Sequence, residues 1–247
     1  MSIDTTLNYS PNFDIKKRKP NQIKFIIFHY TGMKKESDAI KRLLDIKSKV
    51  SCHYFIKNNV EIIVMVPDLY EAWHAGISSW KNFKSLNKHS IGIEISNSGH
   101  QHNYKKFSKK QIQSLKKLSQ FLIKKYKINQ KNILGHSDIA PTRKKDPGEK
   151  FPWKYFAKLG IGKWHSLSNR ILIKKRRKKI SLLDKKNFFK NLSKIGYSIK
   201  RPVKLKKDQF LNSITCSFQR RFRQELVDGK IDQECLIISQ NLVKKFN

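Results

Sequence analysis

Three short apolar runs that each carry a chemically active polar side chain constrain the fold more than any other feature of the sequence. "IKFIIFHYTG" has the pattern of a buried strand with His29 at its carboxyl end, and "KNILGH" predicts a strand that ends near His136. "HSIGIEISNSG" alternates so that isoleucines occupy one face of a strand and Glu94 the other. Polar groups at strand ends predict an α/β (α+β) layer with its chemistry on one edge of the sheet.

The segments between these runs predict helices and a hairpin. Residues 37–50 and 108–126 have apolar side chains at helical spacing, and the second segment begins with a capping-box pattern at Ser108 and Gln111. "CHYFIKNNVEIIVMVP" predicts two strands joined by an Asn-Asn turn. Strands and helices therefore mix along this part of the chain.

The character of the chain changes near residue 165. Residues 166–180 contain the run "SNRILIKKRRKKI" and are expected to form a basic linker. Beyond it, three amphipathic segments predict a small C-terminal three-helix domain at residues 181–247. The predicted organisation is therefore one larger domain at residues 1–165, a linker and a small helical domain.

The positive charge of the chain bears on its partners. Lys and Arg number 54 against 18 Asp and Glu, which gives a net charge of +36. A charge of this size attracts polyanions such as nucleic acid or an anionic envelope polymer. Lys far outnumbers Arg, the better bidentate ligand of phosphate, and the Lys residues are spread over the whole chain. We therefore expect a solvated basic surface and do not expect specific nucleic-acid binding.

Three further observations bear on location. The three cysteines are widely spaced and odd in number, which does not suggest a disulfide framework. No apolar run approaches the roughly 18 residues that a membrane helix needs, so we expect no membrane segment. The first 20 residues lack the apolar core of a signal peptide. These observations predict a cytoplasmic location, with the cell envelope as the alternative.

His29, His136 and Asp146 form a candidate metal site. A zinc hydrolase needs three protein ligands and an open position for water. Two imidazoles at predicted strand ends and one carboxylate in the loop after the second strand supply such a set. Pro147 and Gly148 are expected to hold this loop in a defined turn. A purely structural role for these polar residues is the alternative interpretation.

Glu94 and Lys144 are the candidates for catalysis beside such a site. A carboxylate in an otherwise apolar strand costs free energy if it is buried without a partner, so Glu94 needs a reason to be there. It could accept the proton of the attacking water. Lys144, two residues before Asp146, could stabilise a developing oxyanion.

Five ordered motifs carry a family resemblance: "FHYTG", "CHYFIKNN", "AWHAGISSW", "LNKHSIGIEISNSG" and "GHSDIAPTRKKDPGEKFPW". Over roughly residues 10–165, the chain resembles the type 2 N-acetylmuramoyl-L-alanine amidases, which include the anhydromuropeptide amidases. The resemblance implies a mixed central β-sheet flanked by helices and makes residues 1–165 the catalytic domain. It also implies one zinc ion (Zn2+) held by His29, His136 and Asp146, with Glu94 as general base and Lys144 stabilising the tetrahedral intermediate. The reaction implied is hydrolysis of the amide between N-acetylmuramic acid and L-alanine in peptidoglycan or anhydromuropeptides.

The resemblance also implies a substrate groove. Trp73, His74 and Arg143 match positions that line the groove in such enzymes, and His53 is a further candidate for substrate binding. Simple packing is the alternative for His53 and His74. The remaining histidines are expected to be solvated: His89, His100, His102 and His165. In the C-terminal part, "SFQRRFR" and "VDGKID" resemble the three-helix peptidoglycan-binding domain that is often fused to these amidases.

One departure and three alternatives qualify this interpretation. Cys52 precedes His53 where some relatives carry a tyrosine that helps in the site. A phage-type endolysin, a non-catalytic muramyl-peptide-binding protein and a nucleic-acid-binding protein are the other functions considered. Binding proteins of this family typically lose a metal ligand, whereas this chain keeps all three together with Glu94 and Lys144. An enzyme of cell-wall recycling is therefore the preferred prediction.

Overall fold

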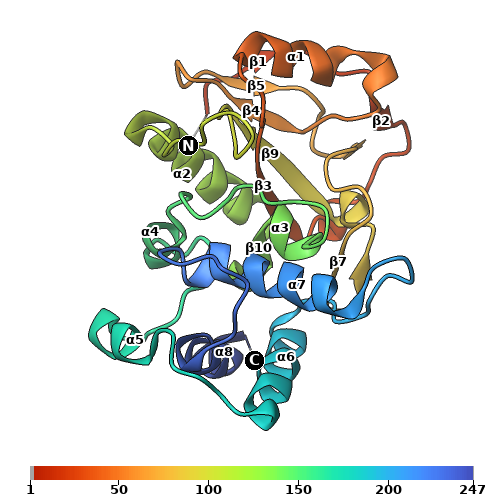
Figure 1. Ribbon diagram of the computed structural model, residues 1–247. Coiled ribbons are helices and arrows are strands. Elements are labelled where there is room, and N and C mark those ends of the chain that lie inside the picture. Colours follow the sequence, from red (N-terminus) through yellow and green to blue (C-terminus); the bar gives the residue numbers. More distant parts are fainter. Residues whose placement is uncertain (1–2, 247) are drawn as a thin grey trace.

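The computed structural model describes residues 3–246 and is built on a mixed six-stranded sheet with the order β1-β5-β4-β9-β3-β10 (Figure 1). Its strands are β1 (Thr6–Leu7), β3 (Phe25–Tyr30), β4 (Tyr54–Ile56), β5 (Ile62–Val64), β9 (Ser90–Ile95) and β10 (Ile133–Gly135). β4 and β5 form the predicted antiparallel hairpin, and the pairs β4–β9, β9–β3 and β3–β10 are all parallel. The predicted α/β class with a mixed central sheet is confirmed.

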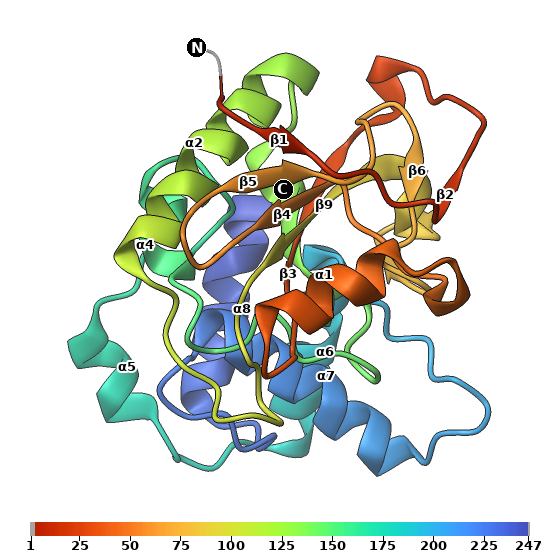
Figure 2. The same cartoon turned by 90° about the horizontal axis from the view of Figure 1, so that it is seen from above.

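Helices cover both faces of this sheet (Figures 1 and 2). They are α1 (Glu36–Leu44), α2 (Lys109–Tyr126), α3 (His136–Ile139), α4 (Trp153–Lys158), α5 (Asn169–Lys175), α6 (Leu182–Ile195), α7 (Lys207–Phe222) and α8 (Gln233–Phe246). Short 3-10 turns lie at Pro20–Gln22, Ile46–Ser48, Leu86–His89 and Gln130–Asn132. Two small antiparallel pairs complete the structure: β2 (Phe13–Asp14) with β6 (Glu71–Ala72), and β7 (Ser79–Trp80) with β8 (Phe83–Lys84).

Strand β3 shows how the sheet separates two cores. Successive side chains of a strand point to opposite faces. Ile26 and Phe28 belong to the core that contains residues of α2 and α4, whereas Phe25 and Ile27 belong to the core that contains residues of α6, α7 and α8. β3 is therefore buried on both faces, which explains why its sequence is a continuous apolar run rather than an alternating one.

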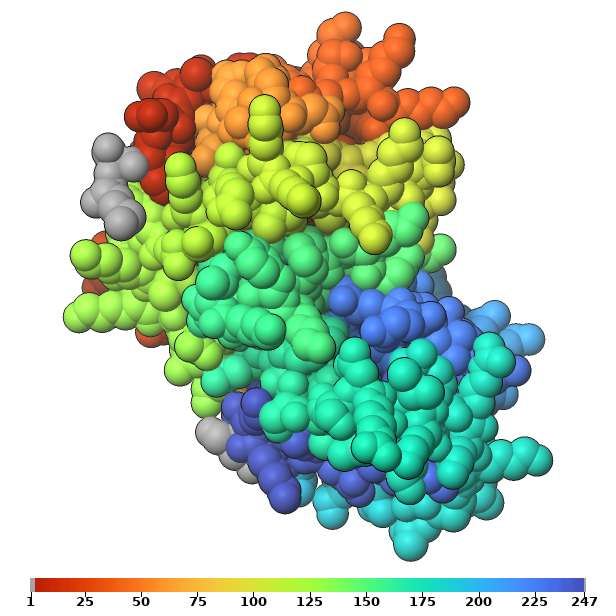
Figure 3. Space-filling view, turned by 90° about the vertical axis from the view of Figure 1, so that its left-hand side faces the viewer, coloured from red at the N-terminus to blue at the C-terminus, as the bar shows by residue number. Residues whose placement is uncertain are grey.

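The C-terminal helices share a core with the sheet. The apolar faces predicted for these helices are confirmed, since Phe188, Phe210 and Phe218 are fully buried beside Phe25 of β3. Figure 3 shows the C-terminal segments (teal to blue) lying against the green segment that precedes them. The segment 166–180, expected to be a linker, contains α5, whose Leu172 is buried.

A buried ion pair joins α7 to α3. The Arg221 guanidinium donates to the Asp138 carboxylate, and its Nη2 also donates to the Ile133 carbonyl at 2.9 Å. The Tyr197 hydroxyl donates to the other Asp138 oxygen at 2.7 Å. Both charged side chains of the pair are about 1% exposed. The C-terminal region therefore holds α3 at Asp138, which lies two residues after His136.

None of the helices within residues 3–246 is both long and apolar enough to cross a membrane.

Replacing Arg221 by Met should lower the free energy of unfolding by about 3–5 kcal/mol, because Asp138 is then left as a buried charge without its partner. Urea unfolding of the metal-free protein followed by circular dichroism measures this. Arg220→Met, which removes a half-buried guanidinium one residue earlier on the same helix, should cost less than about 1 kcal/mol. Equal losses in the two variants would contradict the assigned role of the ion pair.

Candidate functional site

The register of the parallel strands brings the predicted metal ligands together. His29 of β3 lies opposite Glu94 of β9, and Gly135 at the end of β10 lies opposite Phe28. His136 therefore follows its strand at the level of His29. Ligands of α/β sheets commonly bind at this carboxyl edge, where the strands end.

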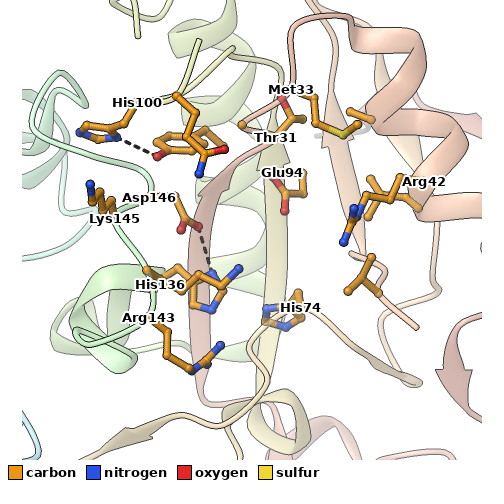
Figure 4. Close-up of a pocket in the computed structure, with 17 residues that line it drawn as sticks. Thr31, Met33, Arg42, His74, Glu94, His100, His136, Arg143, Lys145 and Asp146 are labelled. Carbon is orange, nitrogen blue, oxygen red and sulfur yellow. Dashed lines mark hydrogen bonds and ion pairs between the residues drawn. The ribbon is translucent and has the colours of Figure 1, made fainter. Parts of the chain in front are cut away.

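Three side-chain atoms converge at this edge, and Figure 4 shows His136 and Asp146 of this group with the contact between them dashed. His29 Nδ1 lies 2.9 Å from His136 Nδ1 and 3.0 Å from Asp146 Oδ2, and the last two atoms are also 3.0 Å apart. All three residues are buried. Such a triangle has a point about 2 Å from each atom, which is the length of a Zn–N or Zn–O bond. Of the predicted residues, these three form the group that can hold a metal ion.

The loop that carries Asp146 is fixed by hydrogen bonds around the Pro-Gly turn. The Asp146 carbonyl accepts from the Ser137 amide at 2.8 Å, and the Pro147 carbonyl accepts from the Tyr104 hydroxyl at 2.6 Å. Gly148 has a φ of +83°, in the region that favours glycine, and the Tyr104 hydroxyl would lie only 2.6 Å from a Cβ there. These contacts hold the turn predicted at Pro147 and Gly148 in one conformation.

The charges of the triangle suit a cation. Burial acts to raise the pKa of Asp146, but His136 and His29 beside it outweigh burial and hold this pKa well below its usual range. Burial, aided by His136, lowers the pKa of His29 to about 4. A buried carboxylate therefore faces a neutral imidazole at neutral pH. A divalent cation between them would balance the negative charge, so the residues present fit a bound metal ion.

Glu94 lies opposite His29 in the neighbouring strand, and one of its carboxyl oxygens makes no hydrogen bond within the described part of the chain. Its Oε2 is buried and has no hydrogen-bond partner among residues 3–246. Burial, reinforced by the charge of Asp146 and opposed by that of Lys144, raises the pKa of Glu94 to about 8. This carboxyl group can therefore exchange a proton near neutral pH, as a general acid or base must.

A cavity of about 350 Å³ opens over these groups, between α1 and the loop before Asp146 (Figure 4). Its lining includes Glu94, Lys144 and two arginines on different segments, Arg42 of α1 and Arg143. The Arg143 guanidinium donates to the carbonyls of Ala75, at 3.1 Å, and Ile77, at 2.5 Å. The cavity therefore places a fixed positive group beside the candidate metal site.

The structure separates the four predicted substrate residues. Arg143 and His74 line the cavity. Trp73 and His53 are not among its lining residues: the Trp73 indole donates to Asp14 at 3.3 Å, and His53 is fully buried. The His53 ring packs beside that of His74, with 5.6 Å between ring centroids. Substrate binding by Trp73 and His53 stays a prediction.

Several cavity residues were not predicted from the sequence. Arg42 lies on the polar side of a helix and has no distinguishing sequence signal. His100 was expected to be solvated, yet it is partly buried between the Tyr30 hydroxyl, at 2.8 Å, and Glu149, at 3.0 Å.

The prediction that His165 is solvated was wrong, since this side chain is only 6% exposed. It follows Trp164 in the chain, and the two rings pack 4.9 Å apart.

Cys52 is not a nucleophile. Its thiol is fully buried and lies 3.7 Å from the Met65 sulfur. Burial and then the nearby Glu94 raise the pKa of this thiol well above its usual value. A buried neutral thiol is unreactive, so the cysteine acts as a core residue.

Comparisons with known proteins agree with this geometry. A family model described as N-acetylmuramoyl-L-alanine amidase matches residues 19–149. The N-acetylmuramoyl-L-alanine amidase AmiD of Escherichia coli (strain K12) is 34% identical over 237 residues, which covers 91% of this chain and 84% of that protein. The 1,6-anhydro-N-acetylmuramyl-L-alanine amidase AmpD of Haemophilus influenzae is 34% identical over 165 residues, covering 60% of this chain and 87% of that protein.

Two solved structures extend the likeness to the C-terminal helices. AmiD from E. coli in complex with the substrate anhydro-N-acetylmuramic acid-L-Ala-D-gamma-Glu-L-Lys has a TM-score of 0.78 at 32% identity, over 91% of this chain and 90% of that chain. AMPDH3 from Pseudomonas aeruginosa in complex with anhydromuramic pentapeptide also has a TM-score of 0.78, at 29% identity, over 100% of this chain and 99% of that chain.

In the metal-free protein, Glu94→Gln should become more stable than the wild type as the pH rises from about 4.5 to about 8. Folding raises the pKa of Glu94 from 4.5 to about 8. Between these values the unfolded protein loses the proton of Glu94 while the folded protein keeps it, so the free energy of unfolding of the wild type falls as the pH rises through 8. Glutamine has no such proton to lose. Urea unfolding across this pH range measures the difference between the two proteins.

Glu149→Gln is the matched control. Burial acts to raise the pKa of Glu149, but its hydrogen bond with His100, a backbone hydrogen bond and the nearby positive charges together lower it. The stability of Glu149→Gln relative to the wild type should therefore not increase between pH 4.5 and 8. A constant difference between Glu94→Gln and the wild type would show that Glu94 ionises freely in the folded protein.

Proposed function

The chain belongs to the family of N-acetylmuramoyl-L-alanine amidases, and from that membership we propose how its own residues carry out the hydrolysis. It is an amidase of the kind that acts in cell-wall recycling. The bond split is the amide between N-acetylmuramic acid and L-alanine. The observation that carries the proposal is the buried triangle of His29 Nδ1, His136 Nδ1 and Asp146 Oδ2 beside the carboxyl group of Glu94.

We propose that the metal is zinc, held by His29, His136 and Asp146. Two imidazoles and one carboxylate are a common ligand set of catalytic zinc, and zinc held by such a set would also bind a water molecule. Bound zinc would polarise the scissile carbonyl and make water a stronger acid. The protein residues supply the binding, the orientation and the proton transfer.

Glu94 is proposed to accept the proton of the attacking water and to pass it to the leaving amine of L-alanine. It lines the same cavity as His136 and Asp146, and its raised pKa lets it hold and release a proton near neutral pH. Lys144 also lines the cavity, and we propose that it stabilises the negative charge that develops on the carbonyl oxygen. The Oε2 atom of Glu94 is buried, which shields that oxygen from bulk solvent.

The proposed substrate is a soluble anhydromuropeptide. AmiD and AMPDH3 have been solved with substrates or ligands of this class, and both cover nearly the whole of this chain. Arg42 and Arg143 line the cavity, and we propose that they bind carboxylates of the stem peptide, since guanidinium groups pair well with carboxylates. A role of the C-terminal helices in holding polymeric peptidoglycan and a cytoplasmic location stay predictions.

Removal of zinc should abolish the release of peptide from an anhydromuropeptide, and added zinc should restore it. Asp146→Asn should lose both the bound zinc and the activity, because the remaining ligands are two neutral imidazoles. Mass spectrometry of released peptide and metal analysis of the purified protein measure the two effects. Asp184→Asn, in the first turn of α6 and not among the residues that line the cavity, should match the wild type.

Zinc-bound wild-type protein that binds the anhydromuropeptide without releasing peptide would instead indicate a binding protein. Faster release from intact murein than from the soluble fragment would indicate an endolysin-like enzyme of the cell wall.

Glu94→Gln should keep its zinc but lose turnover by about 10²–10⁴-fold, the usual contribution of a general acid–base group. Turnover of an anhydromuropeptide, with the zinc content measured on the same sample, tests this. Glu225→Gln removes an exposed carboxylate of the C-terminal region and should leave turnover unchanged. A fully active, zinc-loaded Glu94→Gln variant would mean that another group accepts the proton.

A further inference from the structure

One dipeptide, His74–Ala75, contacts both candidate histidine ligands from behind. His74 Nδ1 lies 3.0 Å from His29 Nε2, and the Ala75 carbonyl oxygen lies 3.2 Å from His136 Nε2. In each ligand, the contacted nitrogen is the one that points away from the metal site, since both Nδ1 atoms belong to the triangle. The dipeptide is therefore placed to decide which ring nitrogen of each ligand carries the proton.

The protonation of His136 follows from the chemistry of its partner. A carbonyl oxygen can only accept a hydrogen bond, so His136 Nε2 must carry a hydrogen to bond with Ala75. In a neutral imidazole, the other nitrogen then has a free lone pair. Nδ1 of His136 is thereby left as a ligand atom that faces Asp146.

The protonation of His29 follows from a longer chain of hydrogen bonds. It starts at the Leu86 carbonyl, which can only accept and lies 2.6 Å from Ser90 Oγ, so Ser90 donates its single hydrogen there. Ser90 Oγ must then accept from His74 Nε2, 3.2 Å away. A neutral imidazole that donates from Nε2 carries a lone pair at Nδ1, and His74 Nδ1 faces His29 Nε2. That lone pair accepts the Nε2 hydrogen of His29, and Nδ1 of His29 is left free for the metal.

Two further contacts fix the dipeptide in place. The Asn87 side-chain oxygen accepts from the amides of His74, at 3.2 Å, and Ala75, at 2.7 Å. Gly92 of β9 makes room for the imidazole of His74, because a Cβ at this position would lie 2.3 Å from the ring. The absence of a side chain in the middle of a buried strand thus has a local reason.

From these contacts we propose that His74 and Ala75 are positioning residues that set the tautomer of both zinc-binding histidines, with Ser90 fixing the orientation of His74. The inference rests on the proposed zinc site. It differs from the substrate-binding role predicted for His74, because both of its ring nitrogens are already hydrogen bonded and the residue is only 8% exposed. Partners of this kind hold metal-binding histidines in the productive ring orientation.

His74→Phe tests the proposal, because phenylalanine keeps a ring over Gly92 but cannot accept a hydrogen bond. Zinc affinity, measured by competition with a chromophoric chelator, should fall by about 10–100-fold. Nitrogen-15 spectra of the zinc-loaded wild type should show the Nε2–H of His29 in a hydrogen bond, and in the zinc-loaded variant this hydrogen bond should be lost. The matched control is His165→Phe, which replaces a buried histidine outside the lining of the cavity and should bind zinc as the wild type does.

Ser90→Ala is the second variant and disturbs the chain of hydrogen bonds two steps from the metal site. It should weaken zinc binding in the same direction by a smaller factor, whereas Ser119→Ala, at another fully buried serine, should not. Wild-type zinc affinity in both His74→Phe and Ser90→Ala, or an unchanged Nε2–H signal of His29 in His74→Phe, would overturn the inference. A wild-type protein that binds no zinc would instead contradict the proposed function.

Discussion

The structure depends on a buried carboxylate that faces two imidazoles at the edge of a parallel sheet. Asp146 keeps its charge although it is buried, because His29 and His136 lie 3.0 Å away. A charge in this position is costly unless it is paired. The register of β10, β3 and β9, the turn at Pro147 and the hydrogen bonds behind both imidazoles all keep this arrangement in place.

The surrounding chemistry is a consequence of that arrangement. Glu94 lies opposite His29 in the neighbouring strand, so the register that builds the candidate metal site also brings the proposed proton acceptor to it. Because it is buried near Asp146, its pKa rises to about 8, into the range useful for catalysis. The C-terminal helices contribute to the same region, since Arg221 is paired with Asp138 close to His136. The strong positive charge of the chain also favours an anionic substrate.

Much of this was predictable from the sequence, because it depends on local pattern. The apolar runs before His29 and His136 predict buried strands, and the structure brings both residues together with Asp146. Contacts between distant segments have no such signal. The ion pair of Arg221 with Asp138 spans 83 positions and the contact of His74 with His29 spans 45. Residues of this kind were missed or given another role, because periodicity describes only which face of an element is buried.

The most direct test of this account is X-ray absorption at the zinc edge of the zinc-loaded protein. The account predicts four nitrogen or oxygen ligands, two of which show the multiple scattering of imidazole, and no sulfur. A sulfur ligand, which would implicate a cysteine such as Cys52, or a shell of six ligands would contradict a site made of His29, His136 and Asp146 with one open position.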